Sequence, residues 1–354
     1  MDNFYSLSPD KVKGILENHG YSPVHFKPIY QYFYRADADQ EKILANLPRK
    51  LLDHFKNVYS FPQINIAKEF QSKYDASVKF LLKLDDEQLV EAVLMPERSR
   101  ITLCISSQVG CRQACSFCHT GRMGLTRNLE AGEIIGQVVA ANQWLSMHPS
   151  WLKLVDLPIA QRVSNVVFMG MGEPLDNVPE VTTALKIMLN PQGLNIAPRR
   201  ITVSTAGHLD GLKALINENL GVGIALSLHV PDSQERSRIM PINRRYPLTE
   251  VLDYLKVAPI PKNRHFLIQY TVIAGVNDSI EHAKKLARLL NGINAKVNLI
   301  PLNSFDTTSF KQPDPDDLYA FQGHLLLSGI RSMIRFSKGQ DIEAACGQLA
   351  LSSQ

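Results

Sequence analysis

Four of the five cysteines of this chain lie in the fifteen-residue stretch CISSQVGCRQACSFC, from Cys104 to Cys118. Three of them, Cys111, Cys115 and Cys118, have the spacing C-x3-C-x2-C, which suits a metal-binding loop because thiolates bind soft and borderline metals. Zinc is one candidate, but a closed structural zinc site takes four ligands, commonly in two C-x2-C pairs. A four-iron cluster takes four thiolates, so three would leave one iron open to a substrate or cofactor. Unpaired structural cysteines are the remaining alternative.

The three-cysteine loop, with Phe117 directly before its last cysteine, resembles the loop of the radical S-adenosylmethionine (SAM) enzymes. This resemblance implies that Cys111, Cys115 and Cys118 hold a [4Fe-4S] cluster. It also implies that the amino and carboxylate groups of SAM chelate the open iron, and that an electron from the cluster splits SAM into methionine and a 5′-deoxyadenosyl radical.

Further blocks make the resemblance more specific. They are similar to the RlmN/Cfr family of RNA adenosine methyltransferases and span residues 91 to about 350: CISSQVGC, LEAGEIIGQV, VVFMGMGEPL, STAG, SLHVPD, NLIPLNSF and AACGQLA. The block RNLEAGEIIGQV favours the RlmN branch, which modifies carbon 2 of adenosine, over the Cfr branch, which modifies carbon 8; both remain open. The resemblance implies 23S rRNA and tRNA as substrates, two SAM molecules per turnover and an electron donor such as flavodoxin.

The same resemblance gives roles to the other two cysteines. Carbon 2 of adenine has no lone pair to attack the methyl group of SAM, so polar transfer fails and a cofactor-derived radical is needed. Cys346 is implied to accept a methyl group from one SAM, and then to carry the methylene radical that a second SAM generates and that adds to the adenine. Cys104 is implied to attack Cys346, which releases the product and leaves a transient disulfide, as expected in a reducing compartment.

Glu91, thirteen residues before Cys104, is implied to accept the proton that leaves the adenine carbon. A carboxylate among Val90, Val93 and Leu94 could have a raised pKa, which suits a general base. Without the family context, an outward-facing strand glutamate is the simpler interpretation.

Gly172 and Glu173 stand in GMGEP, directly after a predicted strand. The resemblance implies that this segment binds the ammonium group of SAM, since glycine lets backbone carbonyls approach and a carboxylate suits a cation. The alternative is a helix N-terminus with Pro174 in its first turn. Other positions that match SAM contacts also lie at the ends of predicted strands, where a barrel would bring them together: Ser204, Ser227, Leu228, His229 and Asn303.

The secondary structure predicted around these residues changes along the chain from helices to short strands, and then to alternating strands and helices. Residues 8–58 have helical spacing, with a cap at Ser8, an end at Gly20 and an interruption at Pro48. Short strands at 76–84, 88–96 and 100–106 could pair as a meander. A helix is predicted over 129–145, and 146–161 has the pattern of an irregular insertion. Further strands then alternate with helical segments, at 164–170, 200–207, 223–230, 265–273, 296–303 and 332–339.

This alternation indicates βαβ units, a parallel sheet and right-handed crossovers. Together with the resemblance, it predicts an α/β fold: a radical SAM partial (βα)6 barrel with a small N-terminal helical accessory domain and a short linking β-meander. The expected domains are residues 1–70, helical and RNA-binding; residues 71–103, the linking strands; and residues 104–354, the barrel with the C-terminal catalytic cysteine segment.

Composition limits the other possibilities. The net charge of +4 permits an RNA partner without demanding one, and several arginines could contact phosphates: Arg112, Arg122, Arg127, Arg199, Arg200, Arg244 and Arg245. No apolar run approaches the ~20 residues that cross a bilayer, and the N-terminus lacks the pattern of a secretory signal. We therefore expect a cytoplasmic monomer without a membrane partner. A zinc-binding RNA module and a radical SAM glycyl-radical activase are alternatives from other classes, but the activase has no need for Cys104 and Cys346.

Overall fold

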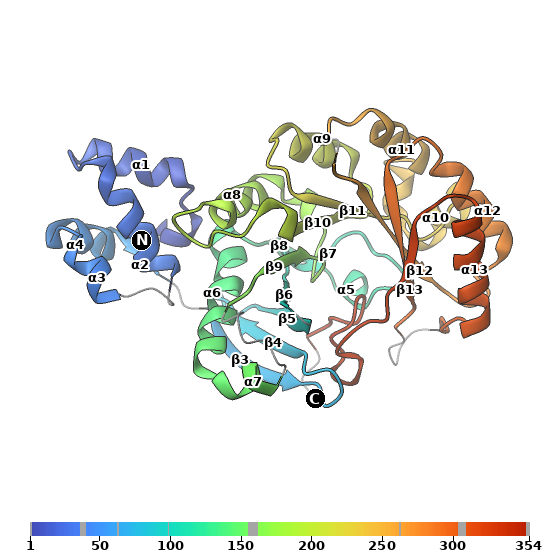
Figure 1. Cartoon of the computed structure of the whole chain (residues 1–354), viewed down its shortest axis with the longest axis horizontal. Helices are drawn as coiled ribbons and strands as arrows, with labels where there is room; N and C mark the ends of the chain where they lie inside the picture. Colours follow the sequence, from blue (N-terminus) through green and yellow to red (C-terminus); the bar gives the residue numbers. More distant parts are fainter. Residues whose placement is uncertain are drawn as a thin grey trace.

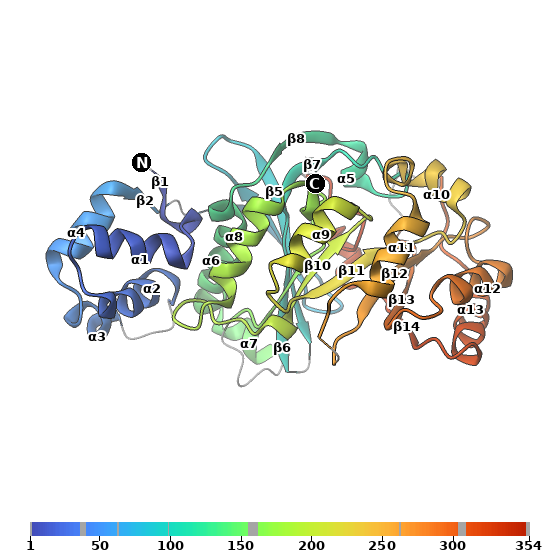
Figure 2. The same cartoon turned by 90° about the horizontal axis from the view of Figure 1, so that it is seen from above.

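The computed structural model describes residues 2–35, 40–61, 64–97, 99–154, 162–261, 263–303 and 309–351. A helical unit at the N-terminus is followed by a long twisted sheet with helices along its outer face (Figure 1, Figure 2). The sheet is mixed and open, so the predicted α/β class and partial barrel are confirmed. In this described part of the chain, no helix combines the length and the apolar character that a membrane crossing requires.

Short helices form the N-terminal unit: α1 (Pro9–Asn18), α2 (Phe26–Tyr34), α3 (Gln40–Ala45) and α4 (Arg49–Val58). Helix α1 begins where the sequence predicts, because the Ser8 side chain accepts a hydrogen bond from the backbone N–H of Lys11. Pro48 directly precedes α4 and separates it from α3, also as predicted. Part of the predicted helical stretch, residues 36–39, lies outside the described residues. The unit is completed by β1 (Asp2–Asn3), β2 (Tyr59–Ser60), and the 3-10 helices η1 (Phe4–Ser6) and η2 (Pro23–His25).

The predicted meander is confirmed and forms one end of the main sheet. Strands β4 (Val78–Lys83), β5 (Leu89–Glu97) and β6 (Arg100–Cys104) pair antiparallel in sequence order. Strand β3 (Asn65–Gln71) extends this edge and was not predicted. Its side chains are mostly exposed, so its sequence NIAKEFQ lacks the apolar alternation of a half-buried strand.

Strand β6 also pairs in parallel with β9, and it therefore joins the meander to the barrel. The parallel strands follow in sequence order: β9 (Asn165–Phe168), β10 (Ile201–Thr205), β11 (Gly223–Ser227), β12 (Phe266–Val272), β13 (Ala295–Pro301) and β14 (Ser332–Ile334). Because the two parts share one sheet, Cys104 at the end of β6 faces the barrel interior. The domain boundaries after residues 70 and 103 stay a prediction.

Helices connect these strands along the outer face of the sheet. Helix α6 (Ala131–Met147) was predicted, and a capping box between Glu130 and Glu133 fixes its first turn. Its residues Ile134, Ile135 and Val138 are buried. The others are α8 (Val178–Leu189), α9 (Leu209–Asn217), α10 (Ser233–Ile239), α11 (Leu248–Val257), α12 (Ile280–Leu289) and α13 (Pro315–Leu327), with η3 (Pro174–Asp176), η4 (Pro198–Arg200) and η5 (Pro241–Arg244) in the loops.

The stretch predicted as an irregular insertion contains the helix α7 (Pro149–Leu154), so that prediction was wrong for these residues. Trp151 of α7 is buried, and its ring packs edge-on against Trp144 of α6 with 5.6 Å between centroids. Burial of this large aromatic surface stabilises a helix too short to form alone. Residues 155–161 of the same stretch lie outside the described residues.

The chain ends in a segment that we call the C-terminal strap, residues 335–351. The strand predicted at 332–339 ends at Ile334, because the chain then leaves the sheet and crosses toward the meander. There the Gly339 N–H donates to Asp75 Oδ2 at 2.8 Å, and Lys338 donates to the Pro96 carbonyl. Gly339 has φ +65, a left-handed conformation that favours glycine, and it begins the 3-10 helix η6 (Gln340–Ile342).

Candidate active site

The three closely spaced cysteines lie on a loop between β7 (Gln108–Cys111) and the short helix α5 (His119–Arg122), with β8 (Gly124–Asn128) pairing back onto β7. The loop is tightly packed. A Cβ added to Gly121 would lie 2.9 Å from the backbone nitrogen of Cys115, so this position requires glycine. The Ser116 N–H also donates to the Ile239 carbonyl at the end of α10 (3.0 Å), which fixes the loop against the barrel.

Burial raises the pKa of all three thiols, to about 12 for Cys111. Cys118, a close neighbour in the loop, raises the pKa of Cys111 and of Cys115 further. In the described part of the chain, no three His, Cys, Asp or Glu side chains converge as ligands of one metal ion. Each cysteine of a four-iron cluster binds a different iron, so its ligands need not meet at one point. The thiols therefore fit the cluster that the sequence predicts.

Glu173 lies beside this loop, five residues beyond the last residue of β9. Its carboxylate accepts backbone N–H bonds from Ala206 (2.7 Å) and Leu175 (3.0 Å), so it also caps η3. Burial nevertheless raises its pKa to about 7. Gly172 has φ +102, and a Cβ there would lie 2.6 Å from the Gln108 side chain, so only glycine permits this approach. Glu173 therefore provides the predicted buried carboxylate and also caps a helix, which was the alternative interpretation of the GMGEP segment.

The other predicted SAM positions occupy successive strand ends. Ser204 donates from Oγ to the Phe168 carbonyl at 2.7 Å, and Ser227 ends β11. His229 has φ +57, and its ring meets Phe117 of the cysteine loop edge-on at 4.9 Å. Burial lowers the pKa of His229 to about 3, so its ring is neutral and Nδ1 accepts from the Thr271 N–H. The Leu228 side chain is fully buried, which leaves its backbone as the group available for contacts.

Arg236 of α10 is a site residue that the sequence analysis missed. Its guanidinium is fully buried and donates to the carbonyls of Ala206 (2.6 Å), Ser227 (3.0 Å) and Leu228 (3.0 Å), and to Asn243 Oδ1 (2.8 Å). It thereby joins the ends of β10 and β11. Its positive charge also lowers the pKa of Cys115. The helical spacing could have indicated this burial. Arg236 lies three residues before the apolar Ile239, so both side chains lie on the same face of α10.

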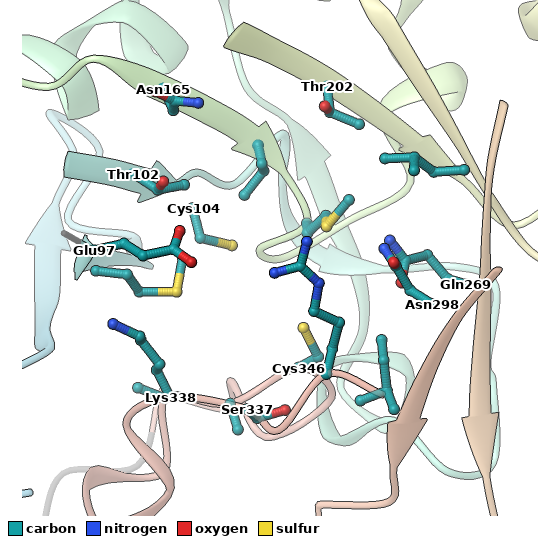
Figure 3. A pocket seen from close by; sticks show the side chains of 18 of the residues that line it. Glu97, Thr102, Cys104, Asn165, Thr202, Gln269, Asn298, Ser337, Lys338 and Cys346 are labelled. Atoms are coloured by element: carbon teal, nitrogen blue, oxygen red, sulfur yellow. The ribbon is translucent and has the colours of Figure 1, made fainter. Parts of the chain in front are cut away.

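Cys104 and Cys346 line one cavity of about 440 Å³ inside the barrel, and both sulfurs point into it (Figure 3). Burial raises the pKa of Cys104, and the Cys346 thiolate raises it further. Solvent reaches Cys346, but the surrounding protein and Cys118 raise its pKa as well. The rest of the wall is rich in polar and basic groups: Thr102, Asn165, Thr202, Gln269, Asn298, Arg199, Arg200, Arg335 and Lys338.

The strap holds Cys346 against the cysteine loop. The His119 N–H donates to the Gly347 carbonyl at 2.7 Å, and Thr120 Oγ1 donates to the Leu349 carbonyl at 2.6 Å. Asn303, predicted as a SAM contact, donates to the Cys346 carbonyl (3.1 Å) and to Ser337 Oγ (2.9 Å). The two residues that follow Asn303 in its motif lie outside the described residues. The cysteine loop, the strap and the segment after β13 therefore meet at Cys346.

Glu91 is fully buried on β5 and is not part of the cavity wall. Its Oε2 accepts the Ala350 N–H at 2.9 Å, and its Oε1 lies 3.1 Å from the Lys79 Nζ. Lys79, a second residue that the sequence analysis missed, also donates to the Glu343 carbonyl at 3.4 Å. Lys79 and Glu91 therefore bind the backbone of the strap at Glu343 and Ala350. Only the register of β4 and β5 brings these two residues together, and no local pattern shows it.

The predicted basic residues fall into three groups. Arg127 donates to both Glu133 and Asp86 at 2.7–2.8 Å, and Arg112 lies 3.6 Å from Asp176, so their charges are already balanced. Arg122 donates to the Ser116 carbonyl, and Arg244 and Arg245 lie at η5. Arg199 and Arg200 are exposed and line the cavity.

Comparison with known proteins identifies the family of the chain. The model of the radical SAM superfamily matches residues 105–289. The chain is 42% identical over 334 residues to the dual-specificity RNA methyltransferase RlmN of Nautilia profundicola, with 91% of each protein covered. It is 40% identical to the protein of the same name in Campylobacter lari, with 96% of each covered.

A solved structure agrees over nearly the whole chain. The crystal structure of a radical SAM methyltransferase from Sphaerobacter thermophilus has a TM-score of 0.87 and 36% identity, with 99% of each chain covered. The cysteine loop, the strand-end pocket and the strap all lie within this shared architecture. The chain therefore belongs to the radical SAM superfamily and, within it, to the RlmN family.

Proposed function

We propose that this protein methylates carbon 2 of adenosine in 23S rRNA and in tRNA. The observation that carries the proposal is the placement of Cys104 and Cys346, from the end of β6 and from the strap, in one cavity beside the cysteine loop. The relatives that cover nearly the whole chain are named dual-specificity RNA methyltransferases, which supports RNA as the substrate class. The cavity is large enough for one unstacked base, as enzymes that act on a base require.

Cys111, Cys115 and Cys118 would hold a [4Fe-4S] cluster, with Glu173, Ser204, Ser227, Leu228, His229 and Asn303 around the SAM site. When bound, cluster and SAM supply the radical that removes a hydrogen atom from a methyl group. Around them, this chain provides the buried side chains of Glu173 and His229. His229 is neutral and cannot repel the sulfonium cation, and Glu173 offers a carboxylate to its ammonium group. The backbone N–H bonds from Ala206 and Leu175 hold that carboxylate in place.

The Cys346 thiolate would take a methyl group from one SAM, and S-adenosylhomocysteine would leave. After a hydrogen atom is removed from this S-methyl group, the S–CH2 radical would add to the adenine carbon. The adduct would then return one electron to the one-electron couple that supplied it.

The resemblance assigns to Glu91 the proton that leaves the adenine carbon. Its carboxylate lies behind the cavity wall, where it accepts from the Ala350 N–H and lies 3.1 Å from Lys79 Nζ, so the strap would have to move aside for a direct transfer. The Cys104 thiolate then attacks Cys346 Sγ. An S–S bond forms, the S–CH2 bond breaks, and its electron pair remains on the carbon, which takes a proton and becomes methyl. A two-electron donor must reduce the disulfide before the next turnover.

The test is nucleoside mass spectrometry of rRNA and tRNA from cells with and without the gene. We expect 2-methyladenosine in both RNAs, lost on deletion, restored by the parent gene and not restored by Cys346→Ala. 8-Methyladenosine would identify the alternative carbon, and unchanged methylation on deletion would contradict the proposed function.

A further inference from the structure

The cavity that holds Cys104 and Cys346 extends toward the amino ends of the parallel strands. Arg199 and Arg200, which directly precede β10, line it, as do Arg100 at the start of β6 and Asn165 at the start of β9. The cysteine loop and Glu173 lie at the opposite ends of these strands. The cavity therefore extends through the barrel, from the side of the cysteine loop to Arg199 and Arg200 at the amino ends of the strands.

Basic residues continue from this mouth along the starts of the next strands. Arg264 and His265 directly precede β12, Lys296 is the second residue of β13, and Arg331 directly precedes β14. Arg199, Arg264 and His265 also line a smaller adjoining cavity of about 150 Å³. We call Arg199, Arg264, His265, Lys296 and Arg331 the basic rim.

The strand register places the rim beside the cavity wall. Leu267 lines the cavity and pairs with Lys296 on the neighbouring strand, so both side chains point to the same face of the sheet. Asn294 connects two further members, since it donates to the Arg264 carbonyl (2.8 Å) and accepts from Arg331 Nη2 (3.4 Å). Burial lowers the pKa of His265, and the positive charges of Lys296, Arg331 and Arg264 lower it further.

The charge of the rim is not balanced within the described part of the protein. There, none of Arg199, Arg264, Lys296 and Arg331 forms an ion pair with a carboxylate, whereas Arg112 and Arg127 near the cysteine loop do. Like charges that are held together repel one another and attract a polyanion. Among the described residues that line the cavity, Glu97 is the one carboxylate, and it is paired with Arg100.

We propose that the basic rim binds the RNA phosphates that flank the target nucleotide, so that the base enters the cavity from the amino ends of the parallel strands. This inference rests on the proposed function. It adds the protein surface that binds the RNA and the end of the barrel from which the base enters. Arginine and lysine contacts to phosphate fix the position of a nucleic acid without reading its sequence. The rim would thus hold both RNA substrates in one register, while the cavity receives the base.

The experiment compares Arg264→Ala, Lys296→Ala, Arg331→Ala and the triple variant with the parent. Lys311→Ala is the matched control, because Lys311 is an exposed cation whose carbonyl accepts from Ala274 beyond the other end of β12. Arg264→Lys keeps the charge. The probe is a fluorescein-labelled RNA hairpin with an adenosine in its single-stranded loop, titrated by anisotropy at several KCl concentrations. Thermal unfolding midpoints show that each variant is folded.

We expect each alanine substitution in the rim to reduce the slope of log K against log salt by about 0.7–0.9, the contribution of one phosphate contact. The triple variant should lose about three such contributions and bind at least tenfold more weakly at ~0.1 M salt. Lys311→Ala and Arg264→Lys should keep the parent slope. The inference fails if folded rim variants keep the parent slope and affinity, or if Lys311→Ala weakens binding equally. A parent that does not bind the hairpin at any salt concentration would overturn the proposed function as well.

Discussion

At the scale of single residues, the site contains two buried charged side chains, Arg236 and Glu173, which hydrogen bonds hold in place. Arg236 is fully buried, and burial lowers its pKa to about 10. Four hydrogen bonds offset the cost of removing this cation from water, and three of them go to carbonyls at the ends of β10 and β11. Glu173 is the corresponding buried acid on the other side of the same loops.

Arg236→Gln should destabilise the protein by about 3 kcal/mol or more, because the carbonyls of Ala206, Ser227 and Leu228 lose their donor in a buried site. Urea unfolding measures the effect. Arg238→Gln is the matched control: Arg238 is exposed on the same helix and its loss should cost less than about 0.5 kcal/mol. Equal costs for the two variants would show that Arg236 does not organise these strand ends.

SAM binding should depend on pH through Glu173. Burial raises the pKa of this carboxyl to about 7, and only the ionised form attracts an ammonium group. SAM affinity should therefore rise as the pH increases through about 7, by up to tenfold per pH unit below the pKa. Equilibrium dialysis with the cluster-loaded parent should show this rise, and Glu173→Gln should bind more weakly with a flat profile. A parent profile that is equally flat would remove Glu173 from the SAM site.

Loss of one loop cysteine should abolish the iron centre. Cys115→Ala should lack stoichiometric iron and sulfide and the visible absorption of a four-iron cluster after anaerobic reconstitution, because three thiolates are the minimum for this loop. Cys104→Ala is the matched control, since it removes a buried thiol outside the loop and should keep full iron content. Full iron content in Cys115→Ala would show that the cluster assignment is wrong.

At the scale of elements, the strap is the feature that local sequence patterns could not place. The periodic strands, the helix over 129–145 and the cap at Ser8 are local signals, and the structure confirms them. Strand β3 and helix α7 are stabilised by contacts with other elements, so their own sequences do not predict them. The cysteine spacing is likewise local, but the meeting of Cys104 with Cys346 and of Lys79 with Glu91 requires the complete fold.

The Lys79–Glu91 pair under the strap should be strongly coupled. Lys79→Met leaves a buried carboxylate without its cation and should cost about 3–5 kcal/mol of unfolding free energy. The double variant Lys79→Met/Glu91→Gln should recover much of that loss, since it removes the uncompensated charge. Urea unfolding of the single and double variants gives the coupling energy. If the double variant is as unstable as the sum of the single variants, the pair does not support the strap as described.

At the scale of the whole molecule, the barrel separates two environments. The cysteine loop and the SAM positions lie around the carboxyl ends of the parallel strands, where barrel enzymes usually place their chemistry. The unbalanced basic residues lie at the amino ends, beside the mouth of the cavity. Cys104 and Cys346 lie in the cavity between these environments, with both side chains directed into it (Figure 3). We propose that the methyl group on Cys346 meets the RNA base there.

The central claim is that the two cysteines in this cavity act in sequence on one RNA-linked carbon, and a single comparison tests it most directly. Cys104→Ala, cluster-loaded and incubated with SAM, reductant and RNA, should accumulate a covalent protein–RNA adduct, because nothing attacks Cys346 to release the product. Cys346→Ala and the double variant should give neither adduct nor methylated adenosine. Denaturing electrophoresis detects the adduct, and nuclease digestion followed by mass spectrometry should leave a modified nucleotide on Cys346. Normal turnover by Cys104→Ala, or an adduct that forms equally well without Cys346, would contradict the account.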